Sequence, residues 1–303
     1  MDRARPPGSA RPVVPSRKIV PMAASLQEQL EVVKELVLPA GEVLLDNLGH
    51  VGRVDIKRAT ELVTDLDGRV EDQLLSGLQR YFPGDAVLAE ESGDRAGTSQ
   101  RTWYIDPLDG TTNYAHGHPF FSISVACADA DHLLLGVVYA PYLDELYVAS
   151  RGGGAELIRP AHGSIAKLSP RAEVTVERAL LATGFPYVRD ELVDRNTGLV
   201  GDFLKARCHG VRRGGSAAVD LVHVAAGKLD GYWEFSLRPW DTAAGTLVAR
   251  EAGALVTDME GQAARIHYQN IVAAAPGLHQ EMIAVIGCSG EPTAEQNPKG
   301  TGS

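Results

Sequence analysis

Two carboxylates set close together by a proline and a glycine are the most informative feature of this 303-residue sequence. Asp106 and Asp109 belong to the stretch 106–113, which reads DPLDGTTN. The large apolar residues before it predict a buried strand, and the proline holds Asp106 in an extended conformation. We expect Gly110 to allow a close turn and the hydroxyls from Thr111 onward to cap a helical turn. Carboxylates at a strand end beside a helix N-terminus suit hard divalent cations next to a phosphate.

Other carboxylates also stand where predicted strands end or predicted helices begin. A short apolar strand over 86–89 runs into Glu90 and Glu91, and successive side chains of an extended chain point to opposite sides. We therefore expect one of the two in the site. Each carboxylate alone is explained as well by a helix cap or a solvated turn, but together they predict a cation site. The set is Asp67, Glu90, Asp106, Asp109, Glu234 and Asp241.

The first half of the chain is predicted to form an antiparallel or mixed sheet flanked by helices. Apolar periodicity predicts a helix from the N-cap Ser25, kinked or ended by Pro39 and continuing over 42–48. A basic loop over 57–67 follows, with Asp67 opening the next helix at 70–81. Further strands are predicted at 120–128, 133–139 and 145–149, with a hairpin turn at 152–154.

The second half alternates strands with helices, which predicts an α/β domain. Strands are predicted at 179–183, 231–234, 254–257 and 270–274, and helices at 190–205, 217–227 and 241–251, the last capped by Asp241. The predicted divisions are a tail or targeting segment at 1–24, an α+β domain at 25–150, an α/β domain at 151–288 and a tail at 289–303.

Composition narrows the class of protein. The net charge of −10 argues against nucleic acid as a partner, and no apolar run is long enough to span a membrane. Three scattered cysteines indicate a reducing compartment, so a cytoplasmic location is predicted. The Arg-rich, acid-poor residues 1–24 leave open a plastid or other organelle, a disordered tail, or a true start at Met22.

Three stretches together resemble the signatures of the inositol monophosphatase superfamily. They are DPLDGTTN at 106–113, AEES at 89–92 and WDTAAG at 240–245. A fourth motif is matched at 62–67, although Glu61 stands where the family usually has Asp. The resemblance covers about 26–286 and implies a magnesium-dependent, lithium-sensitive phosphatase that forms a homodimer. It also implies an α/β fold of five alternating layers, α/β/α/β/α, with the active site between the two domains.

The resemblance further assigns roles to individual residues. Metal, at two or three Mg²⁺ ions per site, would be held by Glu90, Asp106, the carbonyl of Leu108, Asp109 and Asp241. Asp67 would act through water or on a weak third ion. Gly110 and Thr111 would bind phosphate through their amides, and Thr111 with Glu90 would orient and deprotonate the attacking water. No side-chain nucleophile is needed, because divalent ions activate water and neutralise the phosphoryl group.

Substrate selection is assigned to a different set of residues. Glu234 resembles the family carboxylate that accepts hydrogen bonds from inositol hydroxyls, and Gly215, Ser216 and Ala217 would line the same pocket beside Asp109 and Asp241. A carboxylate there favours a polyol monophosphate, best inositol 1-phosphate. Alternatives are fructose-1,6-bisphosphatase, histidinol-phosphatase, a broad sugar phosphatase, or a non-catalytic metal-binding regulator. If Arg212 or Arg213 entered the pocket, a more anionic substrate would be possible.

Overall fold

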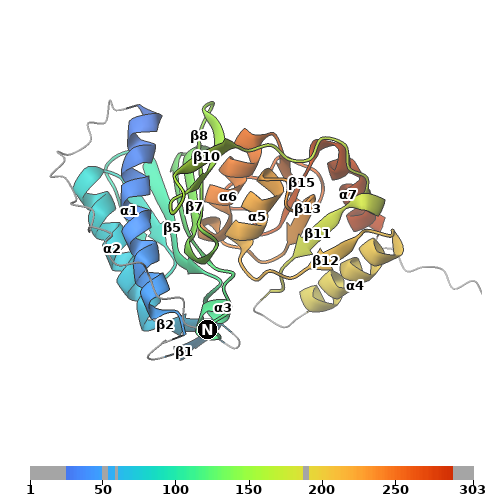
Figure 1. The fold of residues 1–303 in the computed structure, drawn as a ribbon, viewed down its shortest axis with the longest axis horizontal. Coiled ribbons are helices and arrows are strands. Elements are labelled where there is room, and N and C mark those ends of the chain that lie inside the picture. Colours follow the sequence, from blue (N-terminus) through green and yellow to red (C-terminus); the bar gives the residue numbers. More distant parts are fainter. Residues whose placement is uncertain (1–24, 50–53, 59–60, 187–190, 289–303) are drawn as a thin grey trace, which may run out of the picture.

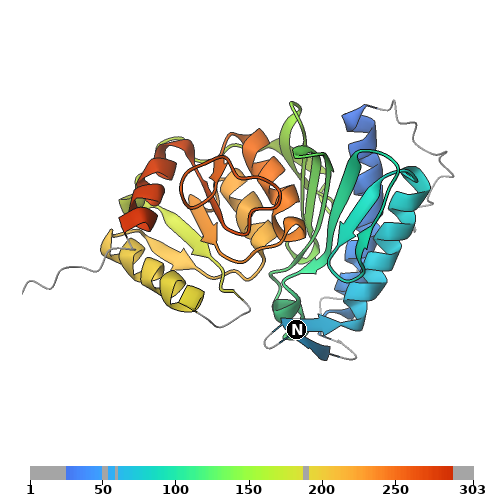
Figure 2. The same cartoon turned by 180° about the vertical axis from the view of Figure 1, so that it is seen from behind.

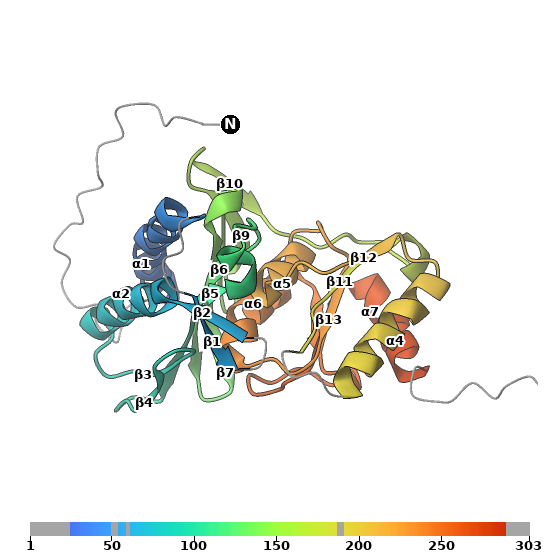
Figure 3. The ribbon, with the colours of Figure 1, turned by 90° about the horizontal axis from the view of Figure 1, so that it is seen from below.

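Five layers, α/β/α/β/α, make up the protein in its computed structural model (Figures 1 and 3). The structure describes residues 25–49, 54–58, 61–186 and 191–288, so the two predicted tails lie outside the described residues. The expected layered α/β sandwich is confirmed. Within the described residues, no helix is long and apolar enough to cross a membrane.

The larger sheet has eight strands in the order β10-β9-β8-β7-β6-β5-β3-β4. Only β3 and β5 pair in parallel, and the other neighbours are antiparallel. The strands are β3 (Ala86–Ala89), β4 (Gly93–Arg95), β5 (Arg101–Asp109), β6 (Ser122–Asp129), β7 (His132–Ala140), β8 (Glu145–Ser150), β9 (Gly154–Arg159) and β10 (Ser164–Lys167). A separate antiparallel pair is formed by β1 (Val54–Arg58) and β2 (Glu61–Thr64).

The smaller sheet has five strands in the order β12-β11-β13-β15-β14. They are β11 (Leu180–Thr183), β12 (Gly210–Arg212), β13 (Gly231–Glu234), β14 (Leu255–Thr257) and β15 (Ile271–Ala274). Because β11 is parallel to both β12 and β13, the carboxyl ends of these three strands lie at one edge. That edge faces the pocket described below.

Helices form the outer and middle layers. The pair α1 (Leu26–Asn47) and α2 (Asp65–Tyr81) covers the outer face of the larger sheet, and α4 (Glu191–Lys205) and α7 (Pro276–Cys288) cover that of the smaller one (Figure 2). Between the sheets lie α5 (Ala217–Ala225) and α6 (Pro239–Ala252). Short turns complete the set: α3 (Thr111–Ala115), η1 (Pro141–Leu143) and η2 (Val176–Arg178).

One continuous apolar core fills the middle layer. It joins Tyr104 and Val138 of the larger sheet, Leu221 and Val248 of the two middle helices, and Tyr232 of the smaller sheet, all nearly inaccessible to solvent. Separate apolar clusters lie under the two outer helical layers. The middle helices therefore belong to both halves of the molecule.

Several predicted boundaries differ from the structure. Pro39 lies inside a single uninterrupted helix, α1, because it is exposed and water can reach the carbonyl that loses its helical hydrogen bond. The predicted basic loop at 57–67 is instead the β1–β2 pair followed by the first turn of α2.

Two carboxylates predicted to open helices are not the caps. Thr64 is the N-cap of α2 and Arg238 that of α6, while Asp67 and Asp241 lie three residues later and accept hydrogen bonds from the cap amides. The sheet also continues past the predicted division at residue 150, since β9 and β10 pair on it. A division by sheets would fall after Lys167.

Candidate active site

A bulge at the end of β5 aims the first two carboxylates. Opposite β6, Asp106 pairs with Ser124 and Asp109 pairs with Ser122, so one extra residue is accommodated between the two aspartates. The amide of Leu108 donates to Asp106 Oδ1 at 2.9 Å, which fixes that carboxylate inside the bulge. Both side chains therefore reach the same pocket instead of lying on one regular strand.

Gly110 follows the bulge in a left-handed conformation, with φ of +96°. A Cβ atom there would lie 3.0 Å from the carbonyl oxygen of Phe120 and 3.1 Å from that of Gly215. Both conformation and space therefore require glycine. The turn leads directly into α3, where Thr111 is buried and faces the pocket.

One pocket collects most of the predicted site residues from both halves of the molecule. The larger sheet and α3 contribute Glu90, Asp106, Leu108, Asp109, Gly110 and Thr111 to its lining. The smaller sheet and the middle helices contribute Gly184, Phe185, Arg213, Gly215, Ala217, Glu234, Leu237 and Asp241. Glu90 therefore lines the pocket, whereas the amide of Glu91 donates to Glu71 Oε2 at 2.9 Å outside it.

Two predicted residues lie immediately behind this lining. Ser216 Oγ donates to Asp109 Oδ2 at 2.6 Å, and the Ala218 amide donates to the same oxygen at 2.8 Å. Asp109 is therefore bonded to the start of α5, across the junction of the two halves. Asp67 is nearly inaccessible to solvent and accepts a hydrogen bond of 3.1 Å from Thr111 Oγ1.

Sequence reasoning did not select Gly184, Phe185 or Leu237, and left the side chain of Arg213 unplaced. The Gly184–Phe185 dipeptide follows β11, whose carboxyl end lies beside that of β13 and Glu234. The meeting of parallel strand ends was a usable signal for these two residues. Leu237 is apolar and carries no chemical signal in the sequence.

The acidic groups of the pocket raise one another's pKa. Burial is the largest cause for Asp106, whose pKa is well above its usual range, and the charges of Glu90, Asp109 and Asp241 add to it. Burial likewise raises the pKa of Asp241, with Glu90 the next cause. For Asp109 burial raises the pKa to about 6, against hydrogen bonds from Ser216 and Ala218 that lower it.

These residues fit a divalent cation by their chemistry. Several buried oxygen ligands that repel one another are a destabilising arrangement unless cations neutralise them, and oxygen ligands suit Mg²⁺. Within the described residues, no three side chains of His, Cys, Asp or Glu converge closely enough to hold a metal ion by themselves. Mg²⁺ keeps several waters, so it can use carboxylates that line a pocket without enclosing it.

Glu234 lies on the opposite wall and is tightly positioned. Its carboxylate accepts a 2.5 Å hydrogen bond from Tyr232, and burial raises its pKa to about 7. A Cβ on Gly184 would lie within 2.1 Å of the same carboxylate, so no side chain fits at that position. Asn196 of α4 fixes the segment, because its Nδ2 donates to the Gly184 carbonyl at 2.5 Å and its Oδ1 accepts from Trp233 Nε1 at 2.7 Å.

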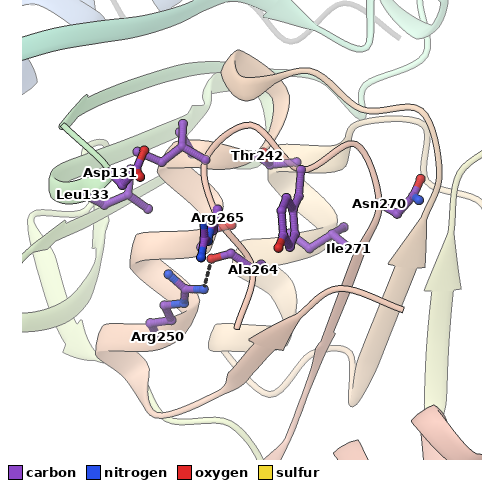
Figure 4. Close-up of a pocket in the computed structure, with 12 residues that line it drawn as sticks. Asp131, Leu133, Thr242, Arg250, Ala264, Arg265, Asn270 and Ile271 are labelled. Carbon is purple, nitrogen blue, oxygen red and sulfur yellow. Dashed lines mark hydrogen bonds between the residues drawn. The ribbon is translucent and has the colours of Figure 1, made fainter. Parts of the chain in front are cut away.

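Another pocket lies beside the same helix α6 but holds none of the predicted residues (Figure 4). Arg250 points into it and donates from Nη2 to the Ala264 carbonyl at 2.6 Å and the Val256 carbonyl at 3.2 Å. Those bonds tie α6 to β14 and to the chain that follows it. The exposed His116 and His118 also lie outside the lining of the acidic pocket. The chemistry is therefore assigned to the pocket of Asp106, Asp109 and Asp241.

Comparisons with known proteins agree with this geometry. Residues 25–290 match the model of the inositol monophosphatase family. A putative Nus factor SuhB of Neisseria meningitidis is 40% identical over 250 residues, covering 82% of this chain and 93% of the relative. An inositol-1-monophosphatase of Synechocystis is 38% identical over 269 residues, covering 88% and 91%. The crystal structure of the extragenic suppressor protein SuhB of Bartonella henselae superposes with a TM-score of 0.80 at 34% identity, covering 86% and 98%.

Proposed function

Because the chain belongs to the inositol monophosphatase family, we propose that this phosphatase hydrolyses small polyol phosphates with Mg²⁺, and that inositol 1-phosphate is its best substrate. The observation that carries the proposal is the pocket itself. It combines the buried carboxylate of Asp106 and the partly buried carboxylates of Glu90, Asp109 and Asp241 with a glycine turn at a helix start. The carboxylates can hold cations, and the backbone amides beside them can bind an anion. A phosphate ester needs both kinds of group.

The proposed ligands of two or three Mg²⁺ ions are Glu90, Asp106, Asp109, Asp241 and the carbonyl of Leu108. When bound, such ions lower the pKa of water and neutralise the phosphoryl oxygens and the leaving alkoxide. The chain's own contribution is to hold these oxygens, from the larger sheet and from helix α6, in one place. Asp109 and Asp241 supply ligands from opposite sides of the domain junction.

Thr111 is the proposed orienting residue for the attacking water. Its hydroxyl proton is directed to the Leu108 carbonyl at 2.9 Å or to Asp67 Oδ1 at 3.1 Å. A lone pair of Thr111 Oγ1 is then available to accept a hydrogen bond from water, and Asp67 or Glu90 can take the proton. Asp67 is held for this role by the amide of Thr64 at 2.9 Å.

The amides of Gly110 and Thr111 are the proposed phosphate donors, because they begin a helical turn and have no carbonyl preceding them in it. Glu234 would accept hydrogen bonds from polyol hydroxyls, with Gly215 and Ala217 forming the floor beside it. A fructose-1,6-bisphosphatase, a histidinol-phosphatase or a broad sugar phosphatase would use the same machinery. We further propose a homodimer, inhibition by Li⁺ and a cytoplasmic location, with an organelle as the alternative.

Phosphate release from a panel of substrates tests the proposal. Inositol 1-phosphate, fructose 1-phosphate, fructose 1,6-bisphosphate and histidinol phosphate would be compared in millimolar Mg²⁺, with and without Li⁺, and after chelation by EDTA. We expect the highest kcat/KM for inositol 1-phosphate, loss of turnover in EDTA and recovery with added Mg²⁺. A tenfold preference for the bisphosphate would contradict the substrate choice.

A regulatory role without turnover is the second candidate. It is favoured by the relatives named Nus factor SuhB, among them that of Escherichia coli at 36% identity over 263 residues. The same panel separates the candidates. Absence of phosphate release from every ester in Mg²⁺ would make the regulatory role the leading explanation.

A further inference from the structure

Arg213 is the one basic side chain among the described residues that line the acidic pocket. It lines the same pocket as Asp109 and Glu234, and its charge partly offsets the rise in the pKa of both groups. Its charge has the same effect on the pKa of Asp220, the buried carboxylate behind that wall. Arg213 directly follows β12, and β11 lies between β12 and β13, so Arg213 belongs to the same wall of the pocket as Glu234.

The Arg213 guanidinium lies over the turn that follows it in the chain. Arg213 Nη1 lies 2.5 Å from where a Cβ of Gly215 would be, so the side chain folds back over that glycine. The turn beneath is fixed, because Asn113 Nδ2 donates to the Gly214 carbonyl at 2.9 Å and to the Phe120 carbonyl at 2.7 Å. Within the described residues no hydrogen bond or ion pair joins Arg213 to an acceptor, and its side chain is exposed at the pocket mouth.

An exposed arginine that lines a binding pocket and donates no hydrogen bond to another described residue is suited to a planar oxyanion of a ligand. The scissile phosphate is served by the amides and cations at the other end of the pocket. From this placement we propose that Arg213 is a specificity residue that binds a second anionic group, phosphate or carboxylate, on the far side of a polyol or sugar phosphate. The inference rests on the proposed phosphatase function and extends its substrate class.

Arg212 is the matched control. It is also exposed and carries the same charge, but its Nη1 lies 3.0 Å from where a Cβ of Gly210 would be, and Arg212 does not line the pocket. Fructose 1-phosphate and fructose 1,6-bisphosphate are the matched substrates, since they differ only in the second phosphate. The quantity measured is the ratio of kcat/KM for the bisphosphate to kcat/KM for the monophosphate.

In R213M we expect this ratio to fall roughly 10- to 100-fold, the range for losing one charge-assisted hydrogen bond. R213K should fall less, because it keeps the charge without the planar fork. R212M should keep the wild-type ratio. Urea unfolding of each variant identifies any that fails to fold, in which case R213K carries the comparison.

Two results would overturn the inference. One is a wild-type enzyme that hydrolyses the monophosphate and not the bisphosphate. The other is an R213M ratio equal to that of wild type, including an equal fall for both substrates, which would place Arg213 on the scissile phosphate. Wild-type enzyme that releases phosphate from neither ester, nor from inositol 1-phosphate, would instead contradict the proposed function itself.

Discussion

Ser216 holds a predicted metal ligand from across the domain junction, which makes its hydroxyl a sensitive point of the site. Its Oγ donates to Asp109 Oδ2 at 2.6 Å and accepts the Val219 amide at 3.3 Å as the N-cap of α5. Ser216→Ala removes both interactions in one step. The substitution should therefore weaken the fold and the metal site together.

The expected change in the free energy of unfolding follows from the two lost hydrogen bonds. Loss of an N-cap side chain costs about 0.5–2 kcal/mol. A hydrogen bond to a charged group contributes about 1.5–3 kcal/mol. At pH 8 Asp109 is ionised, since its pKa is about 6, so S216A should lower the free energy of unfolding by roughly 2–5 kcal/mol.

The loss of stability in S216A should depend on pH. The hydrogen bond from Ser216 lowers the pKa of Asp109, so its removal raises that pKa further above the unfolded value. A raised pKa gives stability that is complete below the unfolded pKa and is lost as the pH rises through the folded pKa. The loss in S216A should consequently be larger at pH 8 than at pH 5.

Urea unfolding in EDTA at pH 5 and pH 8 measures this directly, and titration of activity with Mg²⁺ follows the site. Ser122→Ala is the matched control, because Ser122 is equally buried and its Oγ lies 3.3 Å from Ser216 Oγ. S122A removes a hydroxyl of the same kind that makes no hydrogen bond to the Asp109 carboxylate. If S216A is no more destabilising than S122A, or if its loss is independent of pH, the assigned role of Ser216 is refuted.

Three further substitutions test the electrostatics of the pocket. Asp109→Asn should lower kcat by more than about 100-fold and weaken Mg²⁺ binding, because a charged ligand becomes neutral; near-normal turnover in a phosphate-release assay would remove Asp109 from the site. Glu234→Gln should raise KM for polyol phosphates by about tenfold with little change in kcat, and a loss confined to kcat would contradict its role. Asp220 has a pKa raised by burial and by Glu234, so this one group should contribute a fall in wild-type stability of up to about 1.4 kcal/mol per pH unit as the pH rises from 4 toward that pKa. Asp220→Asn should flatten this dependence in urea unfolding without metal, and an unchanged slope would refute the assignment.

Local signals in the sequence predicted much of the fold. The strand 86–89 and the helix start at Ser25 appear where the apolar pattern and the capping box placed them. The start of α6 was misplaced because Asp241 was treated as a cap, although Pro239 at the first helical position is the better marker. β10 was not predicted, because it is an exposed edge strand with no apolar periodicity.

The part of the candidate site that is formed by residues close together in the sequence could be predicted. One bulge and one turn position Asp106, Asp109 and Gly110. Both features require particular residue types, which can be recognised in the sequence. Which of Arg212 and Arg213 faces the pocket could not be predicted, since it depends on how the glycine turn packs against Asn113, which is 101 residues away from Gly214 in the sequence. Non-local packing of this kind leaves no periodic signal.

The middle layer has a consequence for how the protein could be divided. One apolar core uses α5 and α6 to join Tyr104 of the larger sheet to Tyr232 of the smaller one. A fragment that ends before Ala217 would leave the inner face of the larger sheet without its cover, and a fragment that begins there would lack β11 and β12 of the smaller sheet together with the whole larger sheet. Neither fragment would bury its apolar faces, so neither half is expected to fold when expressed alone. Substitutions at the pocket wall, such as those of Arg213, can change substrate choice without disturbing the core that both halves share.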